Sequence, residues 1–186
     1  IPQRQLLLTR AEGLVSRFSS LDDSLSTQVR FIDQELEAAV SSINSLSQGL
    51  VEINRALATA STSGSQGGKP NELLDERDEA LRQLSELVSV TVIDAGASGQ
   101  VNVFIGNGQP LVIGDSATPI TTPESPDDSS KLDIAMSLNG NEQIISSNLS
   151  GGKLGALLSF RDNELQDSIN GLGRIAIVLA DTAVSY

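Results

Sequence analysis

The sequence contains no cysteine, no histidine and no tryptophan among its 186 residues. Without cysteine, disulfides, thiolate nucleophiles and cysteine-ligated metals are excluded together. Without histidine, the commonest general base and the commonest metal ligand are missing as well. We therefore expect a protein that is not an enzyme and that has no catalytic residues, no cofactor and no metal site.

Aromatic residues and positive charge are also scarce. Aromatic side chains make up only 3% of the chain, so the core must be mainly aliphatic. The chain has 12 Lys and Arg against 24 Asp and Glu, a formal net charge of −12. Because this balance repels phosphate backbones and anionic lipids, we expect no nucleic acid and no membrane as partners. No run of about 18 apolar residues occurs that would span a bilayer.

The first third of the chain has a helical pattern. From Leu8 to Leu57 apolar residues recur at alternating steps of three and four, and only Asp22 interrupts the series. A mean spacing near 3.5 predicts one strand of a coiled coil or a long bundle. Asp22 is either a device that sets the register of the seam or a local break where the helix bends, and the simpler of these expectations is the break. The predicted seam on this helix comprises Leu25, Val29, Ile32, Leu36, Ile43, Leu46, Leu50, Ile53 and Leu57.

Two more helices are predicted by the same spacing. One begins near Pro70 and Asn71 and should pack antiparallel on the first helix. The other follows Gly151 and Gly152 and continues to the end of the chain. Their seam positions are Leu74, Leu81 and Leu84 in the second helix and Leu158, Leu165, Leu172 and Leu179 in the third.

Between these helices the apolar period changes to two, which predicts strands. Asn107-Gly108 and Asn139-Gly140 are preferred dipeptides of hairpin turns, and we expect a type I′ turn at the first. Four or five short strands should form one small antiparallel sheet. The Pro-rich loop at 114–130 has a composition that should not support a packed element.

These elements predict an α+β fold that is mainly α. Three long helices form an elongated antiparallel bundle or coiled coil, and a small antiparallel sheet is inserted between the second and third. The expected domains are a rod-like bundle from 1–89 and 148–186 and a β-rich insertion from 90–147.

Charged and glycine-rich motifs are weak candidates for chemistry. The two Gly-Gly-Lys runs lack the leading Gly and the Ser or Thr of a phosphate-binding loop. The acidic cluster of Glu124, Asp127 and Asp128 lacks the order of a calcium-binding loop and is typical of a solvated linker. Acidic residues alternate with Arg77 and Arg82 on the second helix, which indicates ion pairs on a solvated face. We therefore expect no small-molecule substrate.

Three segments together resemble a known family: Glu72–Leu81, Val101–Val112 and Gly151–Asp162. In this order, after a long heptad helix, they resemble the family of bacterial flagellar hook-associated protein 1, the first junction protein between hook and filament. The middle segment is the most specific. Its family-like hairpin residues are Phe104, Gly106, Asn107, Gly108 and Pro110.

The resemblance implies an extracellular structural protein of the bacterial flagellum, exported by the flagellar secretion apparatus. Its implied partners are hook protein, the second junction protein and copies of itself in the assembled ring. It also implies that this chain is a middle, rod-like fragment of a longer protein. The alternative is a periplasmic sensory or adaptor bundle, in which long helices relay a signal and the sheet binds a partner.

Overall fold

The computed structural model describes residues 2–62, 70–96, 98–138 and 140–184. These residues form two compact units. We call Gln34–Leu158 the central unit, and Ile1–Asp33 together with Ser159–Tyr186 the terminal unit. Helix α1 (Pro2–Thr62) contributes to both, and it is continuous through Asp22, so the predicted break there is wrong.

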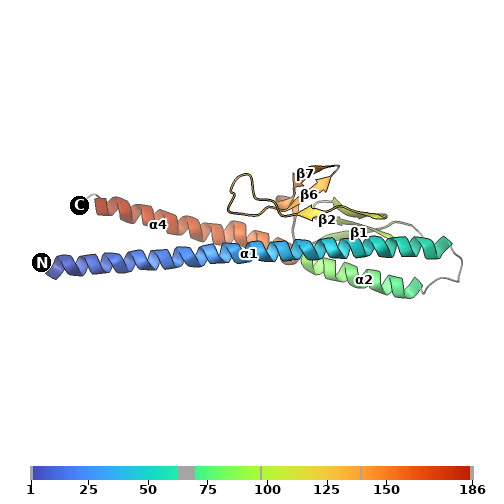
Figure 1. Ribbon diagram of the computed structural model, residues 1–186, viewed down its shortest axis with the longest axis horizontal. Helices are drawn as coiled ribbons and strands as arrows, with labels where there is room; N and C mark the ends of the chain where they lie inside the picture. Colours follow the sequence, from blue (N-terminus) through green and yellow to red (C-terminus); the bar gives the residue numbers. More distant parts are fainter. Residues whose placement is uncertain (1, 63–69, 97, 139, 185–186) are drawn as a thin grey trace. The chain divides into compact units, whose positions relative to one another are not determined.

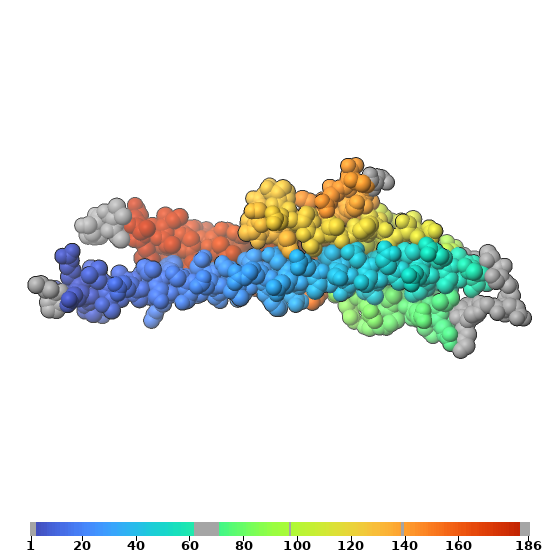
Figure 2. All heavy atoms as spheres, in the orientation of Figure 1, coloured from blue at the N-terminus to red at the C-terminus, as the bar shows by residue number. Residues whose placement is uncertain are grey.

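In the central unit, the second half of α1 is flanked on two sides (Figure 1). Helix α2 (Pro70–Leu87) runs back along one side in the antiparallel direction, and the strands lie along the other. Pro70 suits the first turn of α2 because the N–H that proline lacks has no intrahelical partner there. Figure 2 shows α1 in close contact with both neighbours.

The strands form two antiparallel sheets, and not the single sheet that the sequence predicts. The first has the order β1-β2-β3-β4 and the second the order β5-β6-β7. Their bounds are β1 (Val90–Asp94), β2 (Val101–Ile105), β3 (Gln109–Ile113), β4 (Ser116–Ala117), β5 (Ile120–Thr121), β6 (Ala135–Leu138) and β7 (Asn141–Ile144). The overall class is therefore α+β and mainly helical, with small antiparallel sheets.

The turn between β2 and β3 differs from the predicted one. Ile105 pairs with Gln109, so three residues and not two connect the strands. Gly106 and Gly108 take φ of 54° and 98°, and the Gly108 N–H donates to the Ile105 carbonyl at 3.1 Å. A type I′ turn would instead have positive φ at Asn107 and Gly108 with strands ending directly beside them. The second predicted hairpin is present, because Leu138 pairs with Asn141; Asn139 lies outside the described residues.

The Pro-rich segment 114–130 contains ordered pairing, contrary to the expectation from its composition. Strand β4 and the buried Ile120 of β5 both lie within it. A further bridge joins Glu124 to Leu132. These residues are ordered by tertiary contacts that a composition argument does not include.

The third predicted helix is present as three consecutive helical segments. Helix α3 (Gly152–Ser159) leads into the π-helical segment η2 (Phe160–Leu165) and then into α4 (Gln166–Val184). In the terminal unit, α4 runs antiparallel to the first half of α1, with the two chain ends at the same end (Figure 1). A π-helical turn inside a helix was not expected from the sequence.

Two glycines allow close backbone contacts in the central unit. Gly152 has φ of 57°, and a Cβ added there would lie 2.5 Å from the carbonyl carbon of Leu87. Gly106 has φ of 54°, and a Cβ there would lie 2.3 Å from the carbonyl oxygen of Asn148. Both conformations favour glycine, so these positions fix the start of α3 against the end of α2 and the hairpin against the segment before α3.

Candidate functional site

The described residues do not form an evident catalytic site, so we look for a functional surface by asking which of the predicted residues are buried and which are exposed. The predicted seam divides into three classes of burial. Its buried members are Ile32, Leu36, Ile43, Leu50, Leu57, Leu84, Leu158 and Leu165. Its half-buried members are Leu25, Val29, Leu46, Ile53, Leu74, Leu81 and Leu172. Leu179 is 39% exposed. A single continuous seam through all these positions stays a prediction.

The N-terminal part of the predicted apolar series is open to solvent. Leu8 is 55% exposed and Val15 is 65% exposed. A bundle of three long helices, as the sequence predicts, would bury this face of α1, but these residues are exposed. The helical period specifies which residues share a face, but not whether another element covers that face.

Two asparagines on α1 hold the strands through backbone hydrogen bonds. The buried Asn54 amide donates from Nδ2 to the carbonyls of Val101 and Gly114 at 2.8 and 2.7 Å. Its Oδ1 accepts from the Val101 N–H at 3.0 Å. Ten residues earlier, Asn44 bonds the carbonyl and N–H of Ile120 at 2.8 and 3.0 Å. Each sheet is therefore attached to α1 by one side-chain amide.

Further polar contacts hold the same strands and the start of α3. Arg77 of α2 donates from Nη1 to the Gly99 carbonyl at 2.6 Å. Gln100 donates to the Asn54 carbonyl at 3.1 Å. Lys153 of α3 forms an ion pair with Glu35 of α1. Sequence analysis missed these contacts, because the partners are distant in the chain and their residue types are common on solvated helices.

The family-like hairpin residues lie together at the tip of β2 and β3. Phe104 and Pro110 pair directly across the two strands. Gly106, Asn107 and Gly108 form the connection, and Asn107 and Gly108 are exposed. The hairpin is also anchored to the rest of the central unit, since the Gly106 N–H donates to the Ser89 carbonyl at 3.4 Å. Its functional role stays a prediction.

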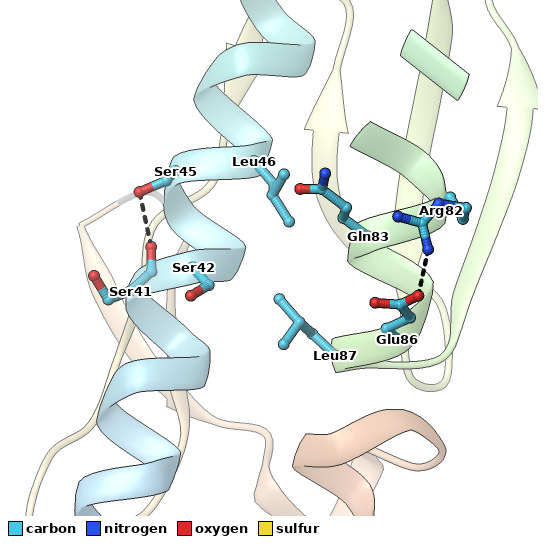
Figure 3. A pocket seen from close by; sticks show the side chains of 8 residues that line it. All are labelled: Ser41, Ser42, Ser45, Leu46, Arg82, Gln83, Glu86 and Leu87. Atoms are coloured by element: carbon cyan, nitrogen blue, oxygen red, sulfur yellow. Dashed lines mark hydrogen bonds and ion pairs between the residues drawn. The ribbon is translucent and has the colours of Figure 1, made fainter. Parts of the chain in front are cut away.

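A shallow hollow of about 600 Å³ lies between α1 and α2 (Figure 3). Leu46 and Leu87 face each other across it, and serines of α1 line the opposite side from Arg82, Gln83 and Glu86. The Ser45 hydroxyl donates to the Ser41 carbonyl at 3.0 Å, and the Ser42 hydroxyl donates to the Ala38 carbonyl at 3.0 Å. These hydroxyls are bonded to their own helix, and the carboxylate in the lining, that of Glu86, pairs with Arg82, so the lining does not present an activated nucleophile.

The charged groups beside the hollow are engaged with one another. Arg82 donates from Nε and Nη2 to the two carboxylate oxygens of Glu79 at 2.8 and 2.7 Å, and it also pairs with Glu86. The hydrogen bonds from Arg82 and Gln83 lower the pKa of Glu79 to about 2, and the same pairing raises the pKa of Arg82. The predicted ion pairing on this helix face is confirmed for Arg82 and Glu79, and Glu86, which the prediction did not include, also pairs with Arg82.

In the acidic cluster of Glu124, Asp127 and Asp128, the Asp128 carboxylate accepts hydrogen bonds from a residue close to it in the chain. Asp128 accepts from the Ser130 hydroxyl and N–H at 2.6 and 3.1 Å, and these bonds together with Lys131 lower its pKa. Across the described residues, no three potential metal-ligating side chains lie close enough to hold an ion. A search of the described helices also finds none with the length and hydropathy to cross a membrane.

Comparison with known proteins places this arrangement among flagellar proteins. The flagellar hook-associated protein 1 of Salmonella typhimurium (strain LT2) is 32% identical over 180 residues, which cover 96% of this chain and 32% of that protein. The protein of the same name from Escherichia coli K12 gives the same identity and coverage. The chain thus spans about a third of the length of these curated relatives.

A solved structure has a similar fold. The flagellar hook junction protein FlgK from Burkholderia pseudomallei aligns with a TM-score of 0.77 at 33% sequence identity. The alignment covers 85% of this chain and 28% of that one. A family described as the helical domain of flagellar hook-associated protein FlgK matches residues 1–183. Since this match takes in nearly the whole sequence, the chain belongs to the FlgK helical-domain family.

Proposed function

We propose that this chain is a structural component of the bacterial flagellum and acts as part of a hook-filament junction subunit. The observation that carries the proposal is the family match over residues 1–183. The relatives named flagellar hook-associated protein 1 and the structural similarity to a flagellar hook junction protein support it. No observation favours the alternative of a periplasmic sensory or adaptor bundle.

In this role the chain acts through packing and not through catalysis. We propose that its three long helices form one rod-like bundle, from 1–89 and 148–186, which carries the β-rich insertion 90–147. The Asn44 and Asn54 amides and the Lys153–Glu35 pair attach the insertion and α3 to α1. Hydrogen bonds and ion pairs of this kind suit a stiff spacer, because a subunit in a tubular wall must keep its shape when neighbouring subunits press against it.

The proposed partners are other axial proteins of the flagellum. These are hook protein, the second junction protein and further copies of the same chain in the assembled ring. The proposed location is extracellular, after export by the flagellar secretion apparatus. Each contact between such subunits can be weak, since symmetry repeats it around the axis and the contributions add.

The proposed function is tested by genetic complementation. The gene that encodes this chain would be expressed in cells that lack hook-associated protein 1. We expect filaments to reattach to hooks, which electron microscopy would count, and swimming in soft agar to recover. A matched control expresses the same gene with residues 90–147 deleted and should not restore filaments. Normal export of the intact protein without restored filaments would contradict the proposed role.

A further inference from the structure

Three Asn-Gly dipeptides occur in the chain: Asn107-Gly108, Asn139-Gly140 and Asn170-Gly171. Asparagine is a chemically labile residue, and a following glycine makes it most labile, because no side chain hinders attack of the glycine nitrogen on the asparagine amide. Asn139 lies outside the described residues. The other two dipeptides lie in different secondary structures, so the fold distinguishes two sites that the sequence makes alike.

Asn107 occupies an open position at the tip of the hairpin between β2 and β3. Asn107 and Gly108 are both exposed. The Asn107 side-chain amide has no hydrogen-bond partner among the described residues. A Cβ added at Gly108 would meet no atom within 4 Å, so the space around this residue is open. Neither packing nor hydrogen bonding therefore holds the side-chain amide away from the Gly108 nitrogen.

One hydrogen bond restrains the Gly108 nitrogen. Its N–H donates to the Ile105 carbonyl at 3.1 Å, within the three-residue connection of the hairpin. Such an exposed turn opens at a low cost in free energy, because few other contacts break with it. The base of the hairpin is held separately, since the Gly106 N–H donates to the Ser89 carbonyl at 3.4 Å. The Gly108 nitrogen can therefore become free without unfolding of the strands.

Asn170 also precedes a glycine, but it lies inside a helix. The helical segments α3, η2 and α4 follow one another from Gly152 to Val184, so Asn170 is far from either end. Its Oδ1 accepts a hydrogen bond from Gln166, one turn earlier, at 3.2 Å. A ring that joins the side-chain carbon to the next backbone nitrogen fixes the asparagine Cα–C bond at a rotation outside the helical range. Several residues of α4 would have to unwind before this ring could form.

We propose that Asn107 is a site of spontaneous chemical modification in the folded protein, and that α4 protects Asn170 from the same reaction. Once hydroxide from the solvent has taken the Gly108 N–H proton, the nitrogen attacks the Asn107 Cγ. A C–N bond forms, the bond from Cγ to the amide nitrogen breaks, and ammonia leaves with a proton from water. Water then opens the resulting cyclic imide at either of its carbonyls. The products are aspartate and isoaspartate, and the reaction needs no oxidant or reductant.

Both products change the tip of the hairpin. Each adds one negative charge to a chain that already carries −12. In isoaspartate the backbone continues through the side-chain carbon, which adds one atom to the connection between Ile105 and Gln109. The hydrogen bond from Gly108 to Ile105 closes this connection at its present length, so we expect the isoaspartate form to lose that bond.

Peptide mapping measures the reaction at each asparagine. The folded chain would be incubated at mildly alkaline pH, digested and analysed by tandem mass spectrometry, which distinguishes the acid from the amide by mass. We expect conversion at Asn107 to be at least about ten-fold faster than at Asn170, which corresponds to about 1.4 kcal/mol of additional opening free energy in the helix. Equal rates in the folded chain, or a faster rate at Asn170, would overturn the proposal.

The unfolded chain provides the matched control. In concentrated guanidinium chloride neither dipeptide is held by structure, so the two asparagines should react at similar rates. If Asn107 reacts there and not in the folded chain, the proposal is wrong.

Asn107→Gln is a second control, because the longer side chain closes its ring much more slowly. This variant should lose the reaction at that position and leave the rate at Asn170 unchanged. Undiminished conversion of the glutamine would contradict attack by the Gly108 nitrogen.

The products and the pH dependence test the route through the imide. Isoaspartate should form together with aspartate, and treatment of the isolated peptide with an isoaspartyl methyltransferase would detect it. The rate should increase with pH, because the Gly108 nitrogen attacks only after it has lost its proton. Aspartate alone, or a rate that does not change with pH in the alkaline range, would indicate direct hydrolysis of the amide and would overturn this route.

Discussion

The central and terminal units use similar helices in different ways. In the central unit the apolar residues of α1 are covered, and its polar residues make specific bonds to strands. In the terminal unit the same helix continues with the same spacing, but its large aliphatic residues from Leu6 to Leu21 are exposed. The same heptad-like pattern therefore forms a buried core in one part of the helix, where other elements pack against it. In the other part, where no described element covers it, the pattern forms an exposed apolar face.

The contrast between the two units can be tested most directly by removing the Asn54 amide, which attaches the first sheet to α1 in the central unit. Asn54→Ala would leave the Val101 N–H and the carbonyls of Val101 and Gly114 without their side-chain partner. Since an unsatisfied buried polar group costs about 1–3 kcal/mol, we expect a loss of about 4 kcal/mol in the free energy of unfolding. Urea denaturation followed by circular dichroism would measure it.

Asn44→Ala provides the matched control for that substitution. Asn44 makes two such bonds and is only partly buried, so its loss should be about half as large. An effect at Asn54 below about 1 kcal/mol would mean that apolar packing alone holds the strands, and equal effects at Asn44 and Asn54 would contradict the expected dependence on burial and on the number of bonds.

Deletion of apolar side chains compares the two units directly. Leu50 on α1 in the central unit is fully buried, whereas Leu8 on the same helix is 55% exposed. Leu50→Ala should reduce the free energy of unfolding by about 3 kcal/mol, because it removes buried methyl groups and leaves a cavity. Leu8→Ala should change it by less than about 0.5 kcal/mol in a monomeric sample. A large effect at Leu8 would show that the terminal unit has a packed core after all.

Glycine-to-alanine substitutions should change the stability of the fold in opposite directions in the two units. Gly152→Ala in the central unit forces a side chain into positive φ and against the backbone of Leu87, at an expected cost of about 2 kcal/mol. Gly173→Ala in α4 meets no atom within 4 Å and should stabilise that helix by up to about 1 kcal/mol. Thermal unfolding of each variant would measure these effects, and a gain at Gly152 would contradict the predicted close contact.

The sequence predicted the helices well and their environments only in part. Periodicity placed long helices at both ends of the chain because the pattern is local and repeats many times. It could not distinguish the buried Leu36 from the exposed Leu8, since both occupy the same phase of the repeat. Whether a helix face is buried depends on elements that lie far away in the chain.

The attachments of the sheets were not predictable for a related reason. Asn44 bonds a residue 76 positions away, and Asn54 bonds residues 47 and 60 positions away. In the sequence each is one asparagine in a polar helix face. Within segment 114–130, Gly114 is bonded to Asn54 and Ile120 to Asn44, and the loop-like composition of the segment does not indicate these contacts.

Acid should act first on the central unit, because most ion pairs among the described residues lie there. The smallest effect that we expect concerns Glu79. Its folded-state pKa of about 2 lies below the ordinary 4.5, chiefly because Arg82 donates hydrogen bonds to its carboxylate. A lowered folded-state pKa means that the ion pair stabilises the fold above pH 4.5 and that this contribution disappears as the pH falls toward 2.

Glu79→Gln should therefore lower the melting temperature slightly at pH 6 and by less at pH 2, because at pH 2, near the folded-state pKa, about half of the parent carboxylates are protonated as well. The effect is small because both partners are exposed and water screens the pair. Glu52→Gln is the matched control, since Glu52 is exposed on α1 of the same unit and has no ion-pair partner in the described residues. A melting difference that is the same at both pH values would show that Glu79 contributes through packing of its side chain and not through its charge.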